Sequence, residues 1–380
     1  MEVPMPDNRM PSLRIGTLES ALPIVQGGMG VGISLSGLAS AVAEEGGIGV
    51  ISTAGIGRGE PDFRSDLKAA DERALRSEIR MARTRTGGIL GVNIMMALSD
   101  YDDLLRVSIE EGIDVIFIGA GLPLGLPEGL TLEEFRNCRA MFVPKISSAR
   151  AAKVILKAWD RHFGRVPDAF AVEGPLAGGH LGFSREDLES GNLNLDTILA
   201  EVLAAVAEYE PDYGSIPVIA AGGIYTGADI HRMLSLGASG VKMGTRFVAT
   251  TECDAHRNFK QAYVDCRKED LVIIDSPVGL PGRAISSDLL TEVERGGKKP
   301  LECIWQCLRT CDVKKAPYCI ASALTSAKLG DLRNGFAFAG ANAYLVDRII
   351  SVKELVSTLI DEFDAACRTA KGKLVLQTVT

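Results

Sequence analysis

Short apolar runs alternate with stretches of helical length from residue 22 to about residue 250. Eight of the runs are mostly continuous, as is usual for strands that are buried on both faces of a sheet. The predicted strands are Leu22–Gln26, Ile48–Ser52, Gly88–Ile94, Val115–Ile118, Met141–Ile146, Ala169–Glu173, Ile216–Ala221 and Gly240–Met243. Between most of them the sequence predicts helices, at Leu35–Glu45, Asp66–Thr84, Asp100–Glu111, Ala149–Trp159, Leu195–Glu208 and Ala228–Leu236.

Eight β/α alternations favour a closed (β/α)8 barrel, the TIM barrel, over an open doubly wound sheet, which stays the structural alternative.

After about residue 250 the pattern of apolar runs and helical stretches changes. Glu252–Cys266 is expected to be a helix and Leu271–Ser287 a Pro- and Gly-rich loop with β character. Further helices are expected at Pro300–Arg309, Ile320–Leu329 and Val352–Arg368. We therefore predict an α/β fold with a TIM barrel over residues 1–250 and a mostly helical C-terminal addition over residues 251–380, packed beside or over the barrel mouth.

The chain is acidic, with 41 Lys and Arg against 49 Asp and Glu and a net charge of −8 over 380 residues. This balance argues against a nucleic-acid-binding protein. The apolar stretches are too interrupted to predict a membrane span, and residues 1–18 lack the apolar centre of a secretory signal. We expect a cytoplasmic protein whose eight cysteines are thiols.

The ends of the last two predicted strands are rich in glycine. Ala221-Gly222-Gly223 follows one apolar run, and Gly244-Thr245 follows the next. A TIM barrel often builds a phosphate site from its last two strands. Glycine lets a phosphate approach the backbone, and free N–H groups at the start of the following helix donate hydrogen bonds to it. The pattern therefore predicts a ligand that carries a phosphate.

Polar residues and glycines also lie at the ends of other predicted strands, where the active sites of barrels are found. Gly27-Gly28-Met29-Gly30 follows the first strand, and Asn93 and Lys145 lie near the ends of the third and the fifth. Glu173 ends the sixth strand. A buried lysine needs a partner, which for Lys145 is either the carboxylate of Glu173 or an electron-rich edge of a ligand.

His180 is the candidate for proton transfer. It is one of four histidines, and it alone lies in a glycine-rich loop directly after a predicted strand. Imidazole titrates near neutrality, so this residue can take or give a proton beside a bound ligand. A loop histidine that only binds the backbone is the alternative, and the position at a strand end favours the functional interpretation.

Four cysteines of the C-terminal addition, Cys303, Cys307, Cys311 and Cys319, need an interpretation of their own. The first three recur every four residues and would share one face of a helix. Four cysteines suffice to bind zinc or an iron–sulfur cluster, but the usual C-x2-C pairs are missing. The expectation is therefore a small buried stripe of cysteines without a metal, and the metal site stays the alternative.

Five motifs together give the chain a resemblance to a known family over nearly its whole length. They are Pro23–Gly30, Gly91–Ile94, Glu173–His180, Ala221–Ile224 and Gly244–Phe247. The chain resembles the FMN-dependent nitronate monooxygenases, formerly called 2-nitropropane dioxygenases. Their superfamily also contains the FMN-dependent enoyl-acyl-carrier-protein reductases. The resemblance implies a TIM barrel that binds FMN.

The resemblance also implies which residues contact the cofactor. They are Gly28, Met29, Asn93, Lys145, Glu173, Gly178, Gly179, Ala221, Gly222, Gly223, Gly244 and Thr245. The two glycine-rich strand ends would hold the phosphate, Asn93 and the glycines after the first strand would line the flavin ring and the ribityl chain, and Lys145 and Glu173 would lie near the pyrimidine end. His180 would be the catalytic base or acid on the substrate side, and Ser276–Arg283 resembles the family loop that closes over that side.

The activity implied by the resemblance is oxidation of alkyl nitronates with O2 to a carbonyl compound and nitrite, with FMN supplying the redox chemistry. An NAD(P)H-dependent reductase of an enoyl thioester or quinone stays the alternative enzyme, and a non-catalytic barrel that binds a phosphate ligand stays the alternative of another class. Many family members have a glutamate where this chain has Leu176, which leaves the substrate open. The expected partners are a small-molecule substrate and O2 or NAD(P)H, without nucleic acid or membrane, and the chain could form a homodimer.

Overall fold

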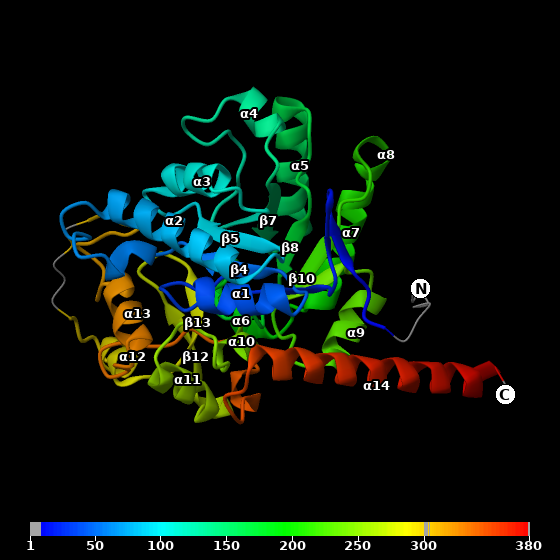
Figure 1. The fold of residues 1–380 in the computed structure, drawn as a ribbon. Helices are drawn as coiled ribbons and strands as arrows, with labels where there is room; N and C mark the ends of the chain where they lie inside the picture. Colours follow the sequence, from blue (N-terminus) through cyan, green and yellow to red (C-terminus); the bar gives the residue numbers. More distant parts are fainter. Residues whose placement is uncertain (1–8, 300–302, 304, 379–380) are drawn as a thin grey trace.

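Eight parallel strands form a barrel at the centre of the molecule (Figure 1). The computed structural model describes residues 9–299, 303 and 305–378. The barrel strands are β3 (Ile24–Gln26), β4 (Gly49–Ser52), β5 (Leu90–Met95), β6 (Val115–Gly119), β7 (Met141–Ile146), β8 (Phe170–Glu173), β10 (Val218–Ala221) and β11 (Gly240–Met243). They pair in the order β3-β11-β10-β8-β7-β6-β5-β4, and a parallel bridge between Val25 and Ile48 joins the first strand to the segment before β4. The TIM barrel and all eight predicted strands are confirmed.

Helices surround the barrel, and the six predicted between the strands are confirmed. They are α1 (Ser36–Glu44), α2 (Leu67–Arg85), α3 (Tyr101–Glu110), α5 (Ala149–Phe163), α7 (Leu195–Ala207) and α9 (Gly227–Ser235). Side-chain caps fix where several begin, because the Asp66 carboxylate accepts the Ala69 N–H and Thr226 forms a capping box with Asp229. Shorter helices occur in the loops, at η1 (Ile56–Gly59), α4 (Leu132–Arg136), α6 (Arg185–Ser190), α8 (Glu210–Tyr213) and α10 (Thr245–Val248).

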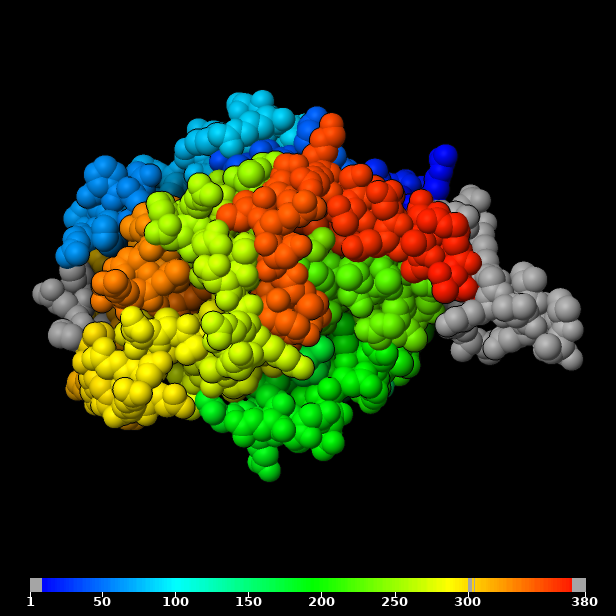
Figure 2. Space-filling model, turned by 90° about the horizontal axis from the view of Figure 1, so that it is seen from below, coloured from blue at the N-terminus to red at the C-terminus, as the bar shows by residue number. Residues whose placement is uncertain are grey.

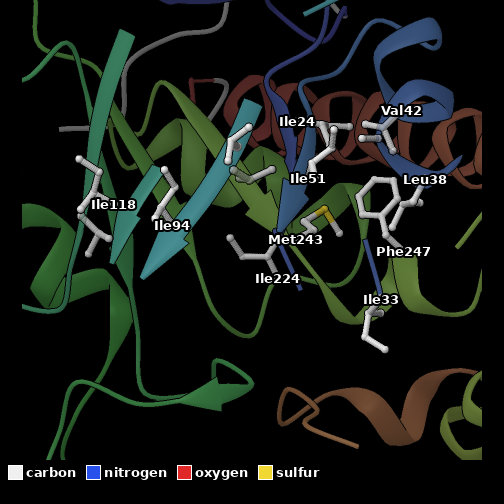
Figure 3. Close-up of a cluster of buried hydrophobic side chains, with 14 of the residues drawn as sticks. Ile24, Ile33, Leu38, Val42, Ile51, Ile94, Ile118, Ile224, Met243 and Phe247 are labelled. Carbon is white, nitrogen blue, oxygen red and sulfur yellow. The ribbon is translucent and has the colours of Figure 1, made fainter. Parts of the chain in front are cut away.

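Two apolar layers stabilise the barrel. Outside it, Ile24 and Ile51 of the strands belong to the same core cluster as Leu38 and Val42 of α1, and Figure 3 draws them. Inside it, inward-facing strand residues such as Phe117 pack on the short hairpin of β1 (Leu13–Ile15) and β2 (Leu18–Ser20), which fills the N-terminal end of the barrel. Each large apolar side chain buried in this way stabilises the fold by roughly 1.5–3 kcal/mol.

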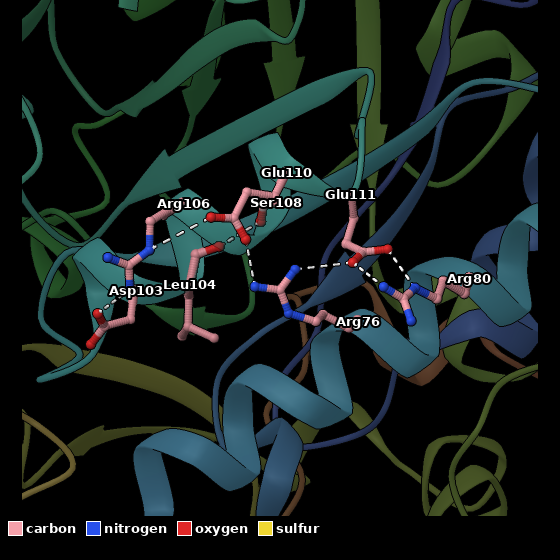
Figure 4. Close-up of polar contacts among 8 residues, drawn as sticks. All are labelled: Arg76, Arg80, Asp103, Leu104, Arg106, Ser108, Glu110 and Glu111. Atoms are coloured by element: carbon pink, nitrogen blue, oxygen red, sulfur yellow. Dashed lines mark hydrogen bonds and ion pairs between the residues drawn. The ribbon is translucent and has the colours of Figure 1, made fainter. Parts of the chain in front are cut away.

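Ion pairs join α2 and α3 on the outer surface (Figure 4). The Glu111 carboxylate contacts Arg80 at 2.7 Å and Arg76 at 3.0 Å, and Arg76 also contacts Glu110. The arginines are partly or largely exposed, so each pair contributes only about 0–1 kcal/mol. The apolar layers therefore dominate the stability of the barrel, and the ion pairs help to align two neighbouring helices.

The C-terminal addition combines helices with a β-hairpin. Its elements are α11 (Arg257–Val264), η2 (Lys268–Asp270), β12 (Leu271–Asp275), β13 (Pro281–Ile285), α12 (Asp288–Glu294), α13 (Ile320–Lys328), η3 (Ala343–Leu345) and α14 (Val352–Thr378). The hairpin agrees with the β character expected for Leu271–Ser287, and β13 also pairs with β9 (Gly179–His180) of a barrel loop. Figure 2, which views the molecule from below Figure 1, shows the addition, coloured yellow-green to red, across much of that face. Helix α14 packs along α9. No helix in the described part of the chain is long and apolar enough to cross a membrane.

The helix predicted at Pro300–Arg309 is wrong where the structure describes this segment. Residues 300–302 and 304 lie outside the described residues, and residues 305–309 are not helical. Leu308 instead forms an antiparallel bridge with Leu98, and the Arg309 N–H donates to the Ala97 carbonyl at 2.8 Å. Hydrogen bonds to the loop after β5 thus replace helical ones.

The prediction of a buried stripe of cysteines is also wrong, because Cys303 is exposed and the other three cysteines of the motif are only partly buried.

Candidate active site

A cavity of about 300 Å³ opens at the C-terminal ends of the barrel strands. It is lined by every residue that the sequence proposes for cofactor binding or catalysis, namely Gly28, Met29, Asn93, Lys145, Glu173, Gly178, Gly179, His180, Ala221, Gly222, Gly223, Gly244 and Thr245. The C-terminal addition contributes further wall residues, among them Phe338 and Asn342. The structure therefore brings the predicted residues together, while the role of each stays a prediction.

Two strand ends form a glycine cradle, made by Gly222 and Gly223 after β10 and Gly244 after β11. Gly222 and Gly223 have φ angles of +96° and +80°, which residues with a side chain rarely adopt. A Cβ atom on Gly223 would lie 2.9 Å from Leu176. The C-terminal addition supports the cradle, because the Asn342 amide donates to the Gly223 carbonyl at 2.7 Å and the Gly340 N–H donates to the Thr245 hydroxyl at 3.1 Å.

Three charged side chains meet on the floor of the cavity. The Lys145 ammonium lies 3.2 Å from a Glu173 carboxylate oxygen, and the Lys242 ammonium lies 3.9 Å from the same oxygen. Of the two partners considered for Lys145, the carboxylate is therefore present. Burial raises the pKa of Glu173, but the two lysines outweigh burial, so the pKa lies below its usual value and the carboxylate stays charged.

Lys242 is the member of this group that the sequence reasoning missed. Its side chain is buried, and its ammonium lies 5.2 Å from the centre of the Phe117 ring. Burial and the charge of Lys145 lower the pKa of Lys242 to about 7, against the attraction of Glu173. The signal was available, because strand alternation directs residue 242 toward the barrel interior once Val241 packs in the outer layer.

His180 lies in β9, which pairs with β13 of the C-terminal addition. Its Nε2 atom lies 2.8 Å from the Ser276 hydroxyl, and its ring packs edge-on against Phe338 with 4.9 Å between the ring centres. Burial, with a smaller effect of the Lys145 charge, lowers the pKa of His180 to about 4. The imidazole is therefore neutral near pH 7 and can accept a proton.

Asn93 lies opposite the glycines that follow β3. Its Oδ1 atom is buried and has no hydrogen-bond partner in the described part of the chain. A Cβ atom on Gly28 would lie 2.3 Å from the Asn93 Cβ, so only glycine fits beside it. A buried oxygen without a partner is costly, and a ligand N–H or O–H in the cavity would satisfy it.

The loop between β8 and β9 is held from the C-terminal addition. Arg283 of β13 donates to the Pro175 and Ala177 carbonyls at 2.8 and 2.7 Å. Leu176 lies between them with 47% of its surface exposed, and its carbonyl accepts the Ala341 N–H. Several apolar or aromatic residues also line the cavity, namely Val31, Ile33, Val248, Phe259, Tyr263, Leu280, Leu324 and Phe338. The cavity thus suits a ligand with an apolar part.

Comparisons with known proteins agree with the predicted family. A family model described as nitronate monooxygenase matches residues 12–362. The (3aS,4S,5R,7aS)-5-hydroxy-7a-methyl-1-oxo-octahydro-1H-indene-4-carboxyl-CoA dehydrogenase of Mycobacterium tuberculosis is 30% identical over 276 residues, 73% of this chain and 66% of that protein. The nitronate monooxygenase of Pseudomonas aeruginosa is 32% identical over 198 residues, 51% of each chain. The chain therefore spans less than two thirds of the length of either relative.

Two solved structures are similar over most of the chain. FabK from Thermotoga maritima has a TM-score of 0.70 and 28% sequence identity, and the match covers 92% of this chain and 95% of that chain. Nitroalkane oxidase from Streptomyces ansochromogenes has a TM-score of 0.69 and 26% identity, with 92% and 98% of the two chains covered.

Proposed function

Because the chain belongs to the nitronate monooxygenase family, whose model spans residues 12–362, we propose that this oxidoreductase uses FMN to oxidise alkyl nitronates with O2 to a carbonyl compound and nitrite. The observation that carries the proposal is the position of His180. A partly buried, neutral imidazole lines a cavity that also contains a glycine cradle and two lysines. The relatives named nitronate monooxygenase and nitroalkane oxidase support the same chemistry.

The residues of the cavity fit FMN. The glycine cradle offers backbone that a phosphate can approach closely, since Gly222 and Gly223 leave no side chain in the way. Asn93 offers an unpaired oxygen to a flavin N–H or a ribityl hydroxyl. Lys145 and Lys242 together exceed the charge of Glu173, which favours an electron-rich ligand beside them. Bound FMN would supply the redox chemistry that links the nitronate to O2.

His180 would take the proton from the carbon of a neutral nitroalkane, or orient a nitronate that is already ionised. The ring is held on both sides, by the Ser276 hydroxyl at Nε2 and by the Phe338 ring. Holding a base in place contributes to rate because the reacting atoms meet in the right orientation. The apolar lining would exclude water from the substrate side.

An NAD(P)H-dependent reductase of an enoyl thioester or quinone is the second candidate. One relative is named as a carboxyl-CoA dehydrogenase, and Leu176 leaves the His180 loop without the glutamate of many family members. In that reaction His180 would donate a proton or contact the dinucleotide. A barrel that only binds a phosphate ligand is the third candidate, and it would show no turnover.

The deciding experiment mixes the purified, FMN-loaded protein under anaerobic conditions with propyl-2-nitronate, with NADPH or with NADH. The visible absorbance of the flavin is followed over time. Rapid bleaching by the nitronate alone, followed by nitrite release after O2 is admitted, supports the proposal. Rapid bleaching by a nicotinamide instead favours the reductase. A protein that does not bind FMN overturns both enzymatic candidates.

A further inference from the structure

A second group of reactive side chains lies outside the cavity, in the C-terminal addition. Cys303, Cys307, Cys311 and Cys319 are all free thiols, spaced C-x3-C-x3-C-x7-C. The Cys307 thiol is within electrostatic range of the thiols of the other three, and the Cys311 thiol of those of Cys303 and Cys319. The proposed oxidation of nitronates uses none of them, so the group needs its own explanation.

The backbone fixes the group at one place beside the barrel. The Ser99 N–H donates to the Cys307 carbonyl at 3.1 Å, and Leu308 bridges to Leu98, so the segment is anchored to the loop after β5. Cys307 and Cys311 pack against the main apolar core. Cys319 directly precedes the first turn of α13, which also contributes Leu324 to the wall of the cavity. The Trp305 indole donates to the Arg64 carbonyl at 3.2 Å and Arg58 contacts Ser322 of α13, so the two segments that contain the four cysteines both lie beside residues 58–64.

Arg58 adds a positive charge beside the four thiols. Its guanidinium donates to the hydroxyl of Ser322 in the first turn of α13 at 3.1 Å, and its charge acts on the Cys307 thiol. The Nε atom of Arg58 is buried and has no partner in the described part of the chain. A partly buried cation needs negative charge nearby; Arg58 acts on the Asp71 carboxyl, whose pKa burial raises to about 8, and four uncharged thiols add none.

Thiolates select soft metals and iron–sulfur clusters. In the described part of the chain, no three His, Cys, Asp or Glu side chains are arranged to hold one metal ion. A four-iron cluster differs, because each cysteine binds a separate iron and the thiolates stand farther apart than around one ion. We propose that Cys303, Cys307, Cys311 and Cys319 ligate a [4Fe–4S] cluster. With four thiolates the oxidised cluster carries a net negative charge, which Arg58 would offset.

The test uses the full-length protein, purified without oxygen and reconstituted with ferric iron, sulfide and dithiothreitol, whose thiols reduce two of every four irons. About four irons and four acid-labile sulfides per chain are expected, as for a site with four cysteine ligands. Dithionite-reduced protein should give the electron paramagnetic resonance of a reduced cluster, a signal that bound flavin does not mimic. Cys307→Ser and Cys311→Ser should lose iron, sulfide and the signal. The control Cys138→Ser, outside the motif, should keep all three.

Three results would overturn the proposal: wild-type protein without iron after reconstitution, stoichiometric zinc on the four thiols, or a native disulfide between two of them. Equal loss in Cys138→Ser would also overturn it, because the effect would then not belong to the motif. If the serine variants fail to fold, iron, sulfide and resonance of the wild-type protein still decide. None of these readouts depends on flavin or on nitronate turnover, so failure here is distinct from failure of the proposed function.

Discussion

At His180 the shape of the side chain and its proton transfer can be separated by substitution. His180→Gln keeps a polar group near the Ser276 hydroxyl but cannot take a proton from carbon. We expect the rate with a neutral nitroalkane to fall by about a hundredfold or more, with smaller loss on a preformed nitronate and unchanged FMN binding. Steady-state kinetics with both substrates measure this split.

His162→Gln is the matched control, because that histidine lies on the exposed face of α5. Equal losses on nitroalkane and nitronate would contradict a role as base.

The pKa of His180, lowered to about 4, adds a second expectation. The imidazole stays neutral across neutral pH and gains its proton only as the pH falls toward about 4, so the activity that depends on it should disappear there and not near its ordinary pKa of 6.5.

Lys242 should destabilise the protein when FMN is absent. Its pKa is about 7 in the folded chain and near its ordinary value of 10.5 in the unfolded chain. Between these two values the unfolded chain binds more protons than the folded chain, so raising the pH through this window favours folding. At pH values below about 7 the lysine is charged in both states, and the folded chain bears the full free-energy cost of burying that charge. Lys242→Met removes that charge while Lys145 still pairs with Glu173.

We therefore expect Lys242→Met to raise the free energy of unfolding of the FMN-free protein by about 1 kcal/mol or more below pH 7. The gain should shrink as the pH approaches the ordinary lysine value. Urea unfolding at several pH values measures this difference, and Lys153→Met, an exposed lysine paired with Glu208, is the control. A destabilised Lys242→Met protein at low pH would show that its contact with Glu173 outweighs the cost of burial.

At the scale of single elements, the turn after β10 joins backbone strain to ligand binding. Gly223→Ala would force a side chain into a φ of +80° and against Leu176, whereas Gly191→Ala meets a similar strain at +68° with no atom nearby. Each substitution should cost about 1–2 kcal/mol of stability. Only Gly223→Ala should also weaken FMN binding, by about tenfold or more. Flavin fluorescence titration compares the two, and equal affinities would mean that the cradle does not contact FMN.

The same elements mark how far the sequence could lead. Buried parallel strands are continuous apolar runs, so all eight barrel strands and the polar residues at their ends could be predicted. The β1–β2 hairpin could not, because its two short strands carry the exposed polar residues Arg14 and Glu19 and so form no continuous apolar run. The segment at 305–309 has no helix because its hydrogen bonds go to the loop after β5, which local spacing does not encode. Ser276 and Asn342 reach the site from distant parts of the chain, so only the folded chain identifies them.

At the scale of the whole molecule, the barrel and the C-terminal addition share one site. The addition supplies the strand that pairs with His180, the amide that binds the Gly223 carbonyl and the arginine that holds the loop at Pro175. Segments that complete each other's hydrogen bonds lose those contacts together when either unfolds. The addition is therefore expected to behave as part of the barrel's cooperative unit, even though the pattern of the sequence changes near residue 250.

Thermal unfolding tests this coupling. We expect the near-ultraviolet circular dichroism of the FMN-loaded protein and the release of flavin fluorescence to change in a single transition with the same midpoint. Asn342→Ala removes one contact between the two parts and leaves the Gly223 carbonyl without its donor, which should cost about 1–3 kcal/mol and lower both midpoints equally. Two separate transitions, with flavin released in the first, would mean that the addition unfolds before the barrel and is an independent unit. If Asn342→Ala lowers only the midpoint of flavin release and leaves the midpoint of the circular dichroism unchanged, the substitution acts only on the glycine cradle. Parts of one cooperative unit would show the same change in both midpoints.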